Sequence, residues 1–122
     1  MSVSDPNCIF CRIVRGEIPS RKVYEDDDVL AFHDIQPVAP VHLLVIPKTH
    51  VATLYDARDE HAAALGRIMT LAGRLAKEQG ASDGFRTIIN TGRVGRQEVM
   101  HVHVHVIAAP DPLGPMIVRK AS

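Results

Sequence analysis

The sequence predicts an α+β domain in which a mainly antiparallel sheet carries one long and one short helix. Three observations lead to this prediction. Only one segment, from about Asp59 to Gln79, has a long helical periodicity. The other apolar segments are short, rich in β-branched residues and closely spaced, which is typical of antiparallel strands. The chain has 122 residues, 46% of them hydrophobic, so we expect one core and a single domain over residues 1–122.

The first part of the chain is expected to contain a short helix followed by three strands. Ile9–Val14 is predicted as the helix, because Gly16 and Pro19 follow it. The turn-forming sequence Asp26-Asp27-Asp28 joins two predicted strands as a hairpin. The third strand is a nearly continuous apolar run ended by Pro47, so it is expected to be central. These strands are Lys22–Glu25, Val29–His33 and His42–Ile46.

The second part is expected to contain the long helix and the remaining strands. Asp56 or Asp59 could cap the helix and Gly80 ends it. Its apolar residues recur at helical spacing: Leu65, Ile68, Met69, Ala72, Leu75 and Ala76. The predicted strands are Arg86–Asn90, Met100–Ala108 and a short one at Met116–Val118. We expect residues 1–7 and 119–122 to be flexible.

The charge balance excludes several classes of partner. Lys and Arg number 14, as do Asp and Glu, so there is no electrostatic reason to expect a nucleic acid or an anionic membrane. No apolar run reaches the roughly 18 residues that a membrane helix needs. Residues 1–7 are short and polar, unlike a secretory signal. We therefore expect a cytoplasmic protein.

Three alternating histidines form the sharpest motif, His101-Val102-His103-Val104-His105. In a strand, residues two apart share a face, so the imidazoles should line one face and the valines the other. One alternative is a half-buried strand with polar residues outside, but threonine, serine or lysine would serve that purpose as well. The other is a three-histidine metal site. The outer imidazoles would lie about 13 Å apart, too far to share one zinc ion easily.

This motif resembles the signature of the histidine triad (HIT) family, and the chain is most similar to its Hint branch. The resemblance extends from Cys8 to about Val118. The supporting segments are Gly16–Pro19, Glu25–Asp27, Leu30–Ile35, His42–Lys48, Gly95–Val99 and Pro112–Met116.

The resemblance implies a HIT-like fold, a homodimer and a nucleotide hydrolase or transferase. It marks His103 as the nucleophile that attacks the α-phosphorus and forms a nucleotidyl-histidine, which water then hydrolyses. An imidazole suits this role, because its ordinary pKa near 6.5 leaves the ring neutral at pH 7. We expect His105 to stabilise charge on the phosphate oxygens, and His42 and His101 to belong to the same catalytic group.

The resemblance also implies a nucleoside site. An apolar pocket for the base would be formed by Ile9, Phe10, Ile13, Phe32 and Leu44. Asp34, followed by Ile35, would accept hydrogen bonds from the ribose hydroxyls. Asn90, Gln97 and Glu98 would surround the phosphate and the leaving group. Each apolar residue could equally belong to the core, and Asp34 could be a turn residue. Two positions depart from the Hint pattern: Arg96 stands where glycine is common, and Met100 where an aromatic residue is common.

The only cysteines, Cys8 and Cys11, allow three interpretations. A thiol-redox motif would need a preceding strand, which the polar N-terminus does not supply. A buried, incidental pair is the second. The third is a metal site, because zinc-binding HIT relatives carry such a pair together with histidines at the places of His50 and His101. Two thiolates and two imidazoles suit a structural zinc.

The function that the resemblance implies is hydrolysis of purine nucleoside 5′-phosphoramidates, with no cofactor required for catalysis. Hydrolysis of dinucleoside polyphosphates, as in the Fhit branch, is the alternative among enzymes. A nucleotide-binding partner protein with incidental turnover is the alternative outside them. The intact triad favours an enzyme, because binding alone needs no nucleophile.

Overall fold

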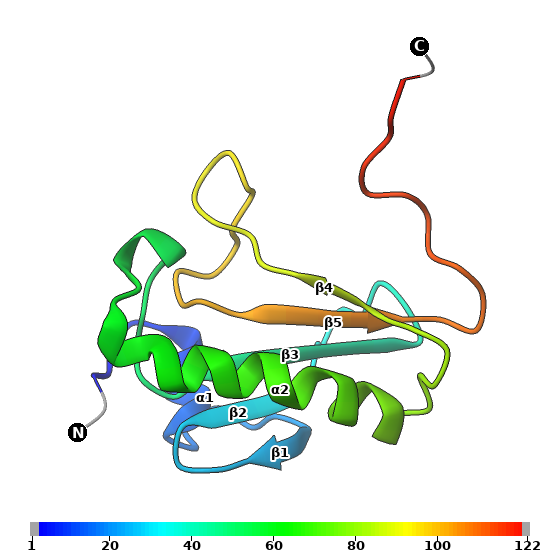
Figure 1. The fold of residues 1–122 in the computed structure, drawn as a ribbon. Helices are drawn as coiled ribbons and strands as arrows, with labels where there is room; N and C mark the ends of the chain where they lie inside the picture. The colour runs from blue at the N-terminus through cyan, green and yellow to red at the C-terminus, as the bar shows by residue number, and fades with distance from the viewer. Residues whose placement is uncertain (1–2, 121–122) are drawn as a thin grey trace.

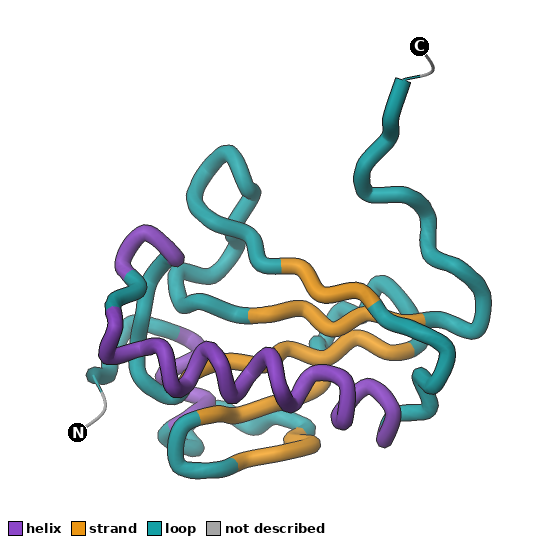
Figure 2. Tube along the Cα trace, in the orientation of Figure 1, coloured by secondary structure: helices purple, strands orange, loops and turns teal. Residues whose placement is uncertain are grey.

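Over residues 3–120, which the computed structural model describes, five short strands pair into one sheet and two α-helices pack on it (Figure 1). Figure 2 shows long loops between the last two strands and after the final one. The elements are α1 (Ile9–Val14), β1 (Lys22–Glu25), β2 (Val29–His33), β3 (Val41–Pro47), the 3-10 turns η1 (Leu54–Asp56) and η2 (Asp59–His61), α2 (Ala62–Glu78), β4 (Arg86–Ile88) and β5 (Val104–Ala108). The predicted α+β class, with one long and one short helix, is confirmed.

The sheet is antiparallel throughout, in the order β1-β2-β3-β5-β4. β3 lies at its centre, as its apolar sequence predicts. Phe32 of β2 pairs with Leu44 of β3, and Leu44 pairs in turn with His105 of β5. Residues directly opposite one another point to the same face, so these three side chains lie in a row across the sheet.

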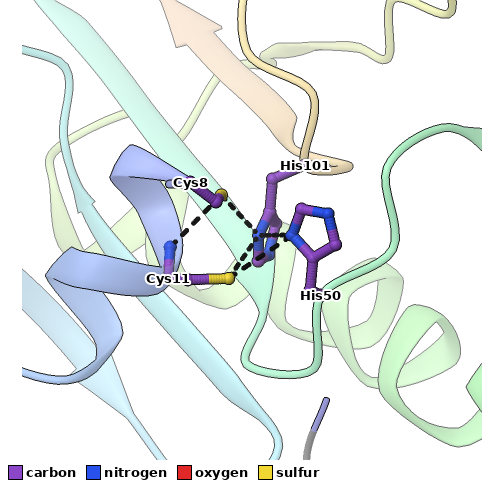
Figure 3. A group of neighbouring side chains, drawn as sticks. All are labelled: Cys8, Cys11, His50 and His101. Carbon is purple, nitrogen blue, oxygen red and sulfur yellow. Dashed lines mark hydrogen bonds between the residues drawn. The ribbon is translucent and has the colours of Figure 1, made fainter. Parts of the chain in front are cut away.

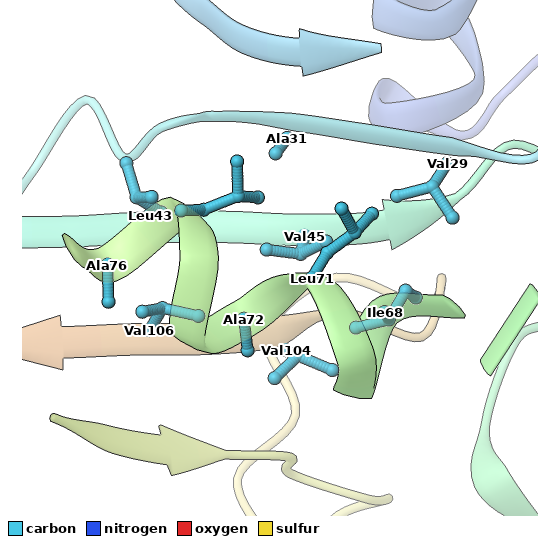
Figure 4. Packing of buried hydrophobic residues seen from close by; sticks show 11 residues of the cluster. Val29, Ala31, Leu43, Val45, Ile68, Leu71, Ala72, Ala76, Val104 and Val106 are labelled. Carbon is cyan, nitrogen blue, oxygen red and sulfur yellow. The ribbon is translucent and has the colours of Figure 1, made fainter. Parts of the chain in front are cut away.

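α2 covers one face of the sheet and forms the larger core with it (Figure 4). Alternate strand residues point at the helix, which is the periodicity of a strand with one face buried. The buried residues on the two sides are Val29, Ala31, Leu43, Val45, Val104 and Val106 from the sheet, and Ile68, Leu71, Ala72, Leu75 and Ala76 from α2. Val104 and Val106 therefore face α2, on the side of the sheet opposite to His105, and the alternation of valine and histidine is as predicted for this part of the motif.

α1 packs on the opposite face, where the remaining strand residues form a second apolar cluster. Phe10 and Ile13 of the helix contact this cluster, and the ring of Phe10 meets that of Phe32 edge to face at 5.7 Å. The cluster also contains Leu30, Leu44 and Ile46 together with the two cysteines. His105 shares this face with Phe32 and Leu44, so the short helix and the histidines lie on the same side.

Two predicted strands are shorter in the structure. The predicted strand Met100–Ala108 is wrong in its first half, because β5 begins at Val104. Its earlier amides are engaged elsewhere: Val102 N–H donates to the carbonyl of Val51, and His101 N–H to that of Val99. The predicted strand Arg86–Asn90 ends at Ile88. His101 and His103 therefore lie before the strand, on a segment without regular secondary structure.

The start of the long helix also differs from the prediction. Residues 59–61 form a 3-10 turn and α2 begins at Ala62. Neither predicted cap is used by α2. The carboxylate of Asp56 closes a capping box with Thr53 on the turn η1. The end is as predicted: Gly80 has a φ of 97° just after the last turn.

Smaller differences concern the exposed parts. Met69 of α2 is exposed and Leu71 is buried in its place. Met116–Val118 forms no strand and is exposed. Of the ends predicted to be flexible, residues 1–2 and 121–122 lie outside the described residues, and Val3 accepts a hydrogen bond from the N–H of His50. Within residues 3–120, no helix is both long and apolar enough to cross a membrane.

Candidate active site

His103 is the middle residue of the predicted triad, and its two ring nitrogens have different roles. Nδ1 donates to the backbone carbonyl of His101 over 2.7 Å, so the proton of the neutral ring is on Nδ1. Nε2 is left with its lone pair. The ring is buried; Phe10 meets it edge to face at 5.2 Å, and the ring of His105 lies 5.0 Å away between centroids. These contacts fix the orientation of an imidazole whose free nitrogen can act as a nucleophile.

The hydrogen bonds of His42 and His105 also fix where their protons lie. The backbone N–H of Val38 donates to Nδ1 of His42 over 3.1 Å, so this nitrogen carries a lone pair. Neutral His42 therefore has its proton on Nε2, which lies 2.9 Å from Nδ1 of His105 and donates to it. Because His105 accepts at Nδ1, its own proton is on Nε2. His105 is thus left with an N–H donor at the end opposite to His42.

Burial keeps this pair of imidazoles neutral. It lowers the pKa of His42, against the smaller opposing effect of the Asp34 carboxylate. Burial also lowers the pKa of His105, with a further contribution from the neighbouring His103 and His42, while Asp34 and Glu98 oppose the shift. At neutral pH the donor and acceptor roles given above are therefore the ones occupied.

The group formed by Asp34, His42 and His105 also has atoms close enough for a metal ion, within 4.8 Å of one another. Asp34 Oδ2 lies 3.4 Å from Nε2 of His42. A metal on this Nε2 would need its lone pair, and the ring proton would then be on Nδ1. That proton would face the N–H of Val38 at 3.1 Å, so two donors would meet. The arrangement fits a hydrogen-bonded chain and not a metal site.

A second cluster brings together the four residues that the sequence suggests as metal ligands (Figure 3). Cys8 precedes α1 and Cys11 lies within it, while His50 follows β3. The sulfur of Cys8 lies 3.4 Å from Nδ1 of His101, and that of Cys11 lies 3.4 Å from Nδ1 of His50. Burial raises the pKa of the Cys8 thiol and lowers the pKa of His101 to about 4. Two sulfurs and two nitrogens thus converge within 4.8 Å.

His101 links this cluster to the nucleophile candidate. Its ring donates from Nε2 to the carbonyl of Pro47 over 2.7 Å, which leaves Nδ1 free to face the cysteines. Its backbone carbonyl is the acceptor for His103. Phe10, which stands between the two cysteines in the chain, contacts the rings of both His101 and His103. A structural change at the cysteines can therefore affect His103 in two ways, through the carbonyl of His101 and through the ring of Phe10.

The loop between β4 and β5 borders an open cavity of about 480 Å³. Its lining residues are Asn90, Gly95, Arg96, Gln97 and Glu98. The amide of Gln97 holds the loop together: its oxygen accepts from the N–H of Gly92 at 2.9 Å, and its nitrogen donates to the carbonyls of Ala52 and Val99. Both amide hydrogens are committed to backbone, so Gln97 positions this loop.

The residues predicted to hold the base fall into two groups. Phe10, Ile13, Phe32 and Leu44 are buried together in the cluster beneath α1. Ile9 is 47% exposed and Ile35 is 93% exposed, and neither belongs to that cluster. Asp34 uses Oδ1 to accept from the N–H of Gln36 and holds Oδ2 near His42. The structure thus brings Asp34, His42, His103 and His105 to one face of the sheet.

The groups that sequence reasoning missed are main-chain groups. The N–H of Val38 and the carbonyl of Pro47 orient His42 and His101, yet no side-chain pattern marks them. Only the folded backbone brings them to the rings.

Comparison with known proteins identifies the family of the chain. Residues 15–111 match the family model described as the HIT domain. The chain is 50% identical to the purine nucleoside phosphoramidase of Escherichia coli (strain K12), over 92% of this chain and 94% of that protein. It is also 50% identical to a 14 kDa zinc-binding protein of Brassica juncea, over 81% of this chain and 89% of that one.

A solved structure gives the same result for the fold. A HIT family hydrolase from Clostridium thermocellum superposes with a TM-score of 0.88 at 40% identity, covering 94% of this chain and all of that one. The family match spans most of the chain, and it includes His101, His103 and His105. The chain therefore belongs to the HIT domain family.

Proposed function

We propose that this protein hydrolyses purine nucleoside 5′-phosphoramidates through a nucleotidyl intermediate on His103. The observation that carries the proposal is the hydrogen bond from Nδ1 of His103 to the carbonyl of His101, which leaves a lone pair on Nε2. Membership of the HIT family and the likeness to a protein named HIT family hydrolase support a hydrolase. The phosphoramidate substrate is supported by the relative that is named for it.

The reaction has two steps. Nε2 of His103 forms a bond to the α-phosphorus while the phosphorus–nitrogen bond breaks, and the departing amine keeps that electron pair and takes up a proton. Water then attacks the nucleotidyl-histidine, which releases the nucleoside monophosphate, frees Nε2 and yields a proton. His105 would donate from its Nε2–H to a phosphate oxygen as negative charge builds there. His42 would hold His105 in that donor form.

The nucleoside would lie beside α1. Its base would contact the small accessible parts of Phe10, Ile13, Phe32 and Leu44, each only 4–7% exposed, and the more exposed Ile9 and Ile35, with Oδ2 of Asp34 accepting from the ribose. A purine offers more contact area than a pyrimidine, so an apolar surface favours it. Asn90 and Glu98 would face the phosphate and the leaving group from the cavity on the other side.

A structural zinc is the second part of the proposal. Cys8, Cys11, His50 and His101 supply two thiols and two imidazoles, the donor set of a closed tetrahedral zinc site. The bond from His101 to the carbonyl of Pro47 is the outer-shell partner that orients such a ligand. The relative named as zinc-binding supports the same ion. Zinc would stabilise the N-terminal segment and leave the phosphorus chemistry to the histidines.

A homodimer is the third part. β4 is an edge strand, and exposed apolar side chains flank its two ends and lie on the neighbouring surface of α2. These include Phe85 and Ile89 near β4 and Met69 on the helix. The ring of Phe85 packs at Gly73 of α2, so the two surfaces are continuous. Light scattering should give the mass of two chains for the wild type, and Met69→Lys should lower the measured mass. A wild type with the mass of one chain would contradict the dimer.

The nucleophile is tested by comparing two histidine variants. His103→Ala should lower the turnover of an adenosine phosphoramidate by roughly 10³-fold or more, because a covalent nucleophile is lost. His33→Ala is the matched control, since His33 pairs with Leu43 and points to the α2 face. Wild type quenched in alkaline denaturant, in which a nucleotidyl-histidine is stable, should carry a nucleoside monophosphate on the peptide that contains His103. Turnover by folded His103→Ala at the wild-type rate would remove this residue from the role.

Dinucleoside polyphosphate hydrolysis remains the second candidate, because the cation of Arg96 lies at the cavity. Incubating the protein with an adenosine phosphoramidate and a diadenosine polyphosphate side by side decides between them. Nucleotide binding with no His103-dependent turnover of either compound would instead favour a binding protein.

A further inference from the structure

We infer that Arg96 selects substrates whose leaving group carries a negative charge. The inference rests on the proposed function and deepens it, because it assigns a chemical class to the group that departs from phosphorus. Three observations carry it: the backbone conformation of Arg96, its unpaired charge at the cavity, and the order of the groups across the sheet.

Arg96 is held in a backbone conformation that costs energy for any residue but glycine. Its φ is 60°, and it is the sole non-glycine residue with a positive φ in the described range 3–120. The surrounding loop imposes this conformation: Arg96 N–H donates to the carbonyl of Arg93 at 3.1 Å, and Gln97 N–H to that of Gly92 at 3.0 Å. Strain of this kind persists where the surroundings enforce it, and it is concentrated at functional sites.

The side chain of Arg96 brings a free cation to the cavity. It lines the cavity, is exposed, and makes no ion pair or hydrogen bond with any residue between 3 and 120. If this cation were only solvated, nothing would favour arginine at a left-handed position that glycine occupies at less cost. Glu98 also lines the cavity, so a leaving group must place its negative charge at Arg96 and away from that carboxylate.

The order of the strands indicates which part of the substrate reaches Arg96. Phe32 lies on β2, Leu44 on β3 and His105 on β5, in one row. The row ends at Ile88 of β4, which pairs with His105. The proposed nucleoside contacts thus lie on one side of the histidines, and the loop that follows β4 lies on the other. A nucleotide bound with its phosphorus at His103 directs its leaving group toward that loop.

An arginine in this place recognises an anionic oxygen group. A guanidinium donates two parallel hydrogen bonds to a carboxylate or a phosphate. Such a group could be the carboxylate of a leaving amine or a further phosphate of a polyphosphate chain. Because the side chain is exposed, we expect a selectivity of roughly three- to tenfold and not more.

The test compares paired substrates that differ only in charge. They are the adenosine 5′-phosphoramidates of β-alanine and of its neutral carboxamide, with diadenosine triphosphate as a third arm. The proteins are wild type, Arg96→Gln and Arg93→Gln. The last is the matched control, an exposed arginine of the same loop that does not line the cavity. The ratio of kcat/KM for the anionic over the neutral phosphoramidate should fall roughly three- to tenfold in Arg96→Gln and stay unchanged in Arg93→Gln.

Binding measurements separate this inference from the proposed function. The Kd values of the two phosphoramidates are measured in the His103→Ala background, with and without Arg96→Gln, and the same ratio is formed. Should turnover be absent while this ratio depends on Arg96, the inference stands and the proposed function fails. Ratios that do not respond to Arg96, together with unchanged turnover of diadenosine triphosphate in Arg96→Gln and with turnover that does depend on His103, overturn the inference alone. A loss confined to diadenosine triphosphate identifies the further phosphate as the anion that Arg96 recognises.

Arg96→Gly supplies a readout of the strain. It should raise the Tm by a few degrees while it lowers the charge selectivity, because the backbone is relieved and the cation is lost. Arg96→Gln should not raise the Tm, since it keeps a side chain on the strained residue. An unchanged Tm in Arg96→Gly would contradict the strained conformation on which the inference is built.

Discussion

Gly95→Ala should open the loop that borders the cavity and lower activity. A Cβ at this glycine would lie 2.5 Å from the carbonyl oxygen of Thr91 and 2.7 Å from its nitrogen. Real Cβ atoms do not come within 3.0 Å, and both obstacles are backbone atoms that cannot rotate away. The turn must therefore widen by about half an ångström or more, which we expect to cost about 1–3 kcal/mol of stability. It would also displace the adjoining Arg96 and Gln97.

Displacements of this size at a positioned substrate are costly to rate, and we expect kcat/KM for an adenosine phosphoramidate to fall by about 10- to 100-fold. The assay is steady-state kinetics together with a thermal melt. Gly66→Ala is the control, because a Cβ there meets open space within α2 and should stabilise the protein by up to about 1 kcal/mol. Wild-type kcat/KM and Tm in Gly95→Ala would show that the loop accommodates the Cβ, and would refute its role in positioning the site.

Three further predictions concern acid stability, the metal and the proton positions. Burial raises the pKa of Asp26, but hydrogen bonds from Tyr24, backbone N–H groups and Arg67 outweigh it and lower this pKa below its unfolded value. The resulting stabilisation is present above the unfolded pKa and is lost as the pH falls through the folded pKa. The free energy of unfolding, measured between about pH 4 and 2, should therefore fall less steeply in Asp26→Asn than in wild type. Zinc should be found at about one ion per chain, and both a chelator and Cys11→Ser should lower the zinc content and the Tm; well-folded protein that takes up no supplied zinc contradicts the site. In an NMR titration the rings of His42 and His105 should protonate below pH 6.5, and a midpoint above it would contradict their buried, neutral pairing.

The sequence predicts those parts of the fold that depend on local pattern. The helix Ile9–Val14 and the strands Lys22–Glu25 and Val29–His33 have the predicted bounds, because glycine, proline and aspartate mark their ends. The start of β5 could not be predicted, since valine alternates with histidine from residue 101 onward, and only the tertiary bond from Val102 to Val51 shows where the ladder stops.

Within α2 and at the site, prediction from the sequence is again limited by contacts between distant segments. Met69 and Leu71 both stand near the edge of the apolar stripe, and the angle at which the helix meets the sheet decides which one is buried. The four cluster residues come from three separate segments, so the Cys-x-x-Cys spacing alone could not bring His50 to them. The left-handed backbone of Arg96 could not be predicted from the sequence, because arginine by itself disfavours that conformation.

The positions of the ring protons at this site are determined by main-chain groups. Three main-chain groups determine which nitrogen of three imidazoles is protonated: the N–H of Val38, the carbonyl of His101 and the carbonyl of Pro47. Such groups are the same whatever the side chain. Position 38, whose side chain is largely exposed, can therefore vary freely in evolution, with proline as the one residue that would remove the donor. Most single substitutions at the residues that supply these main-chain groups should therefore leave the protonation of the three rings unchanged. Substitutions that move the backbone should alter it.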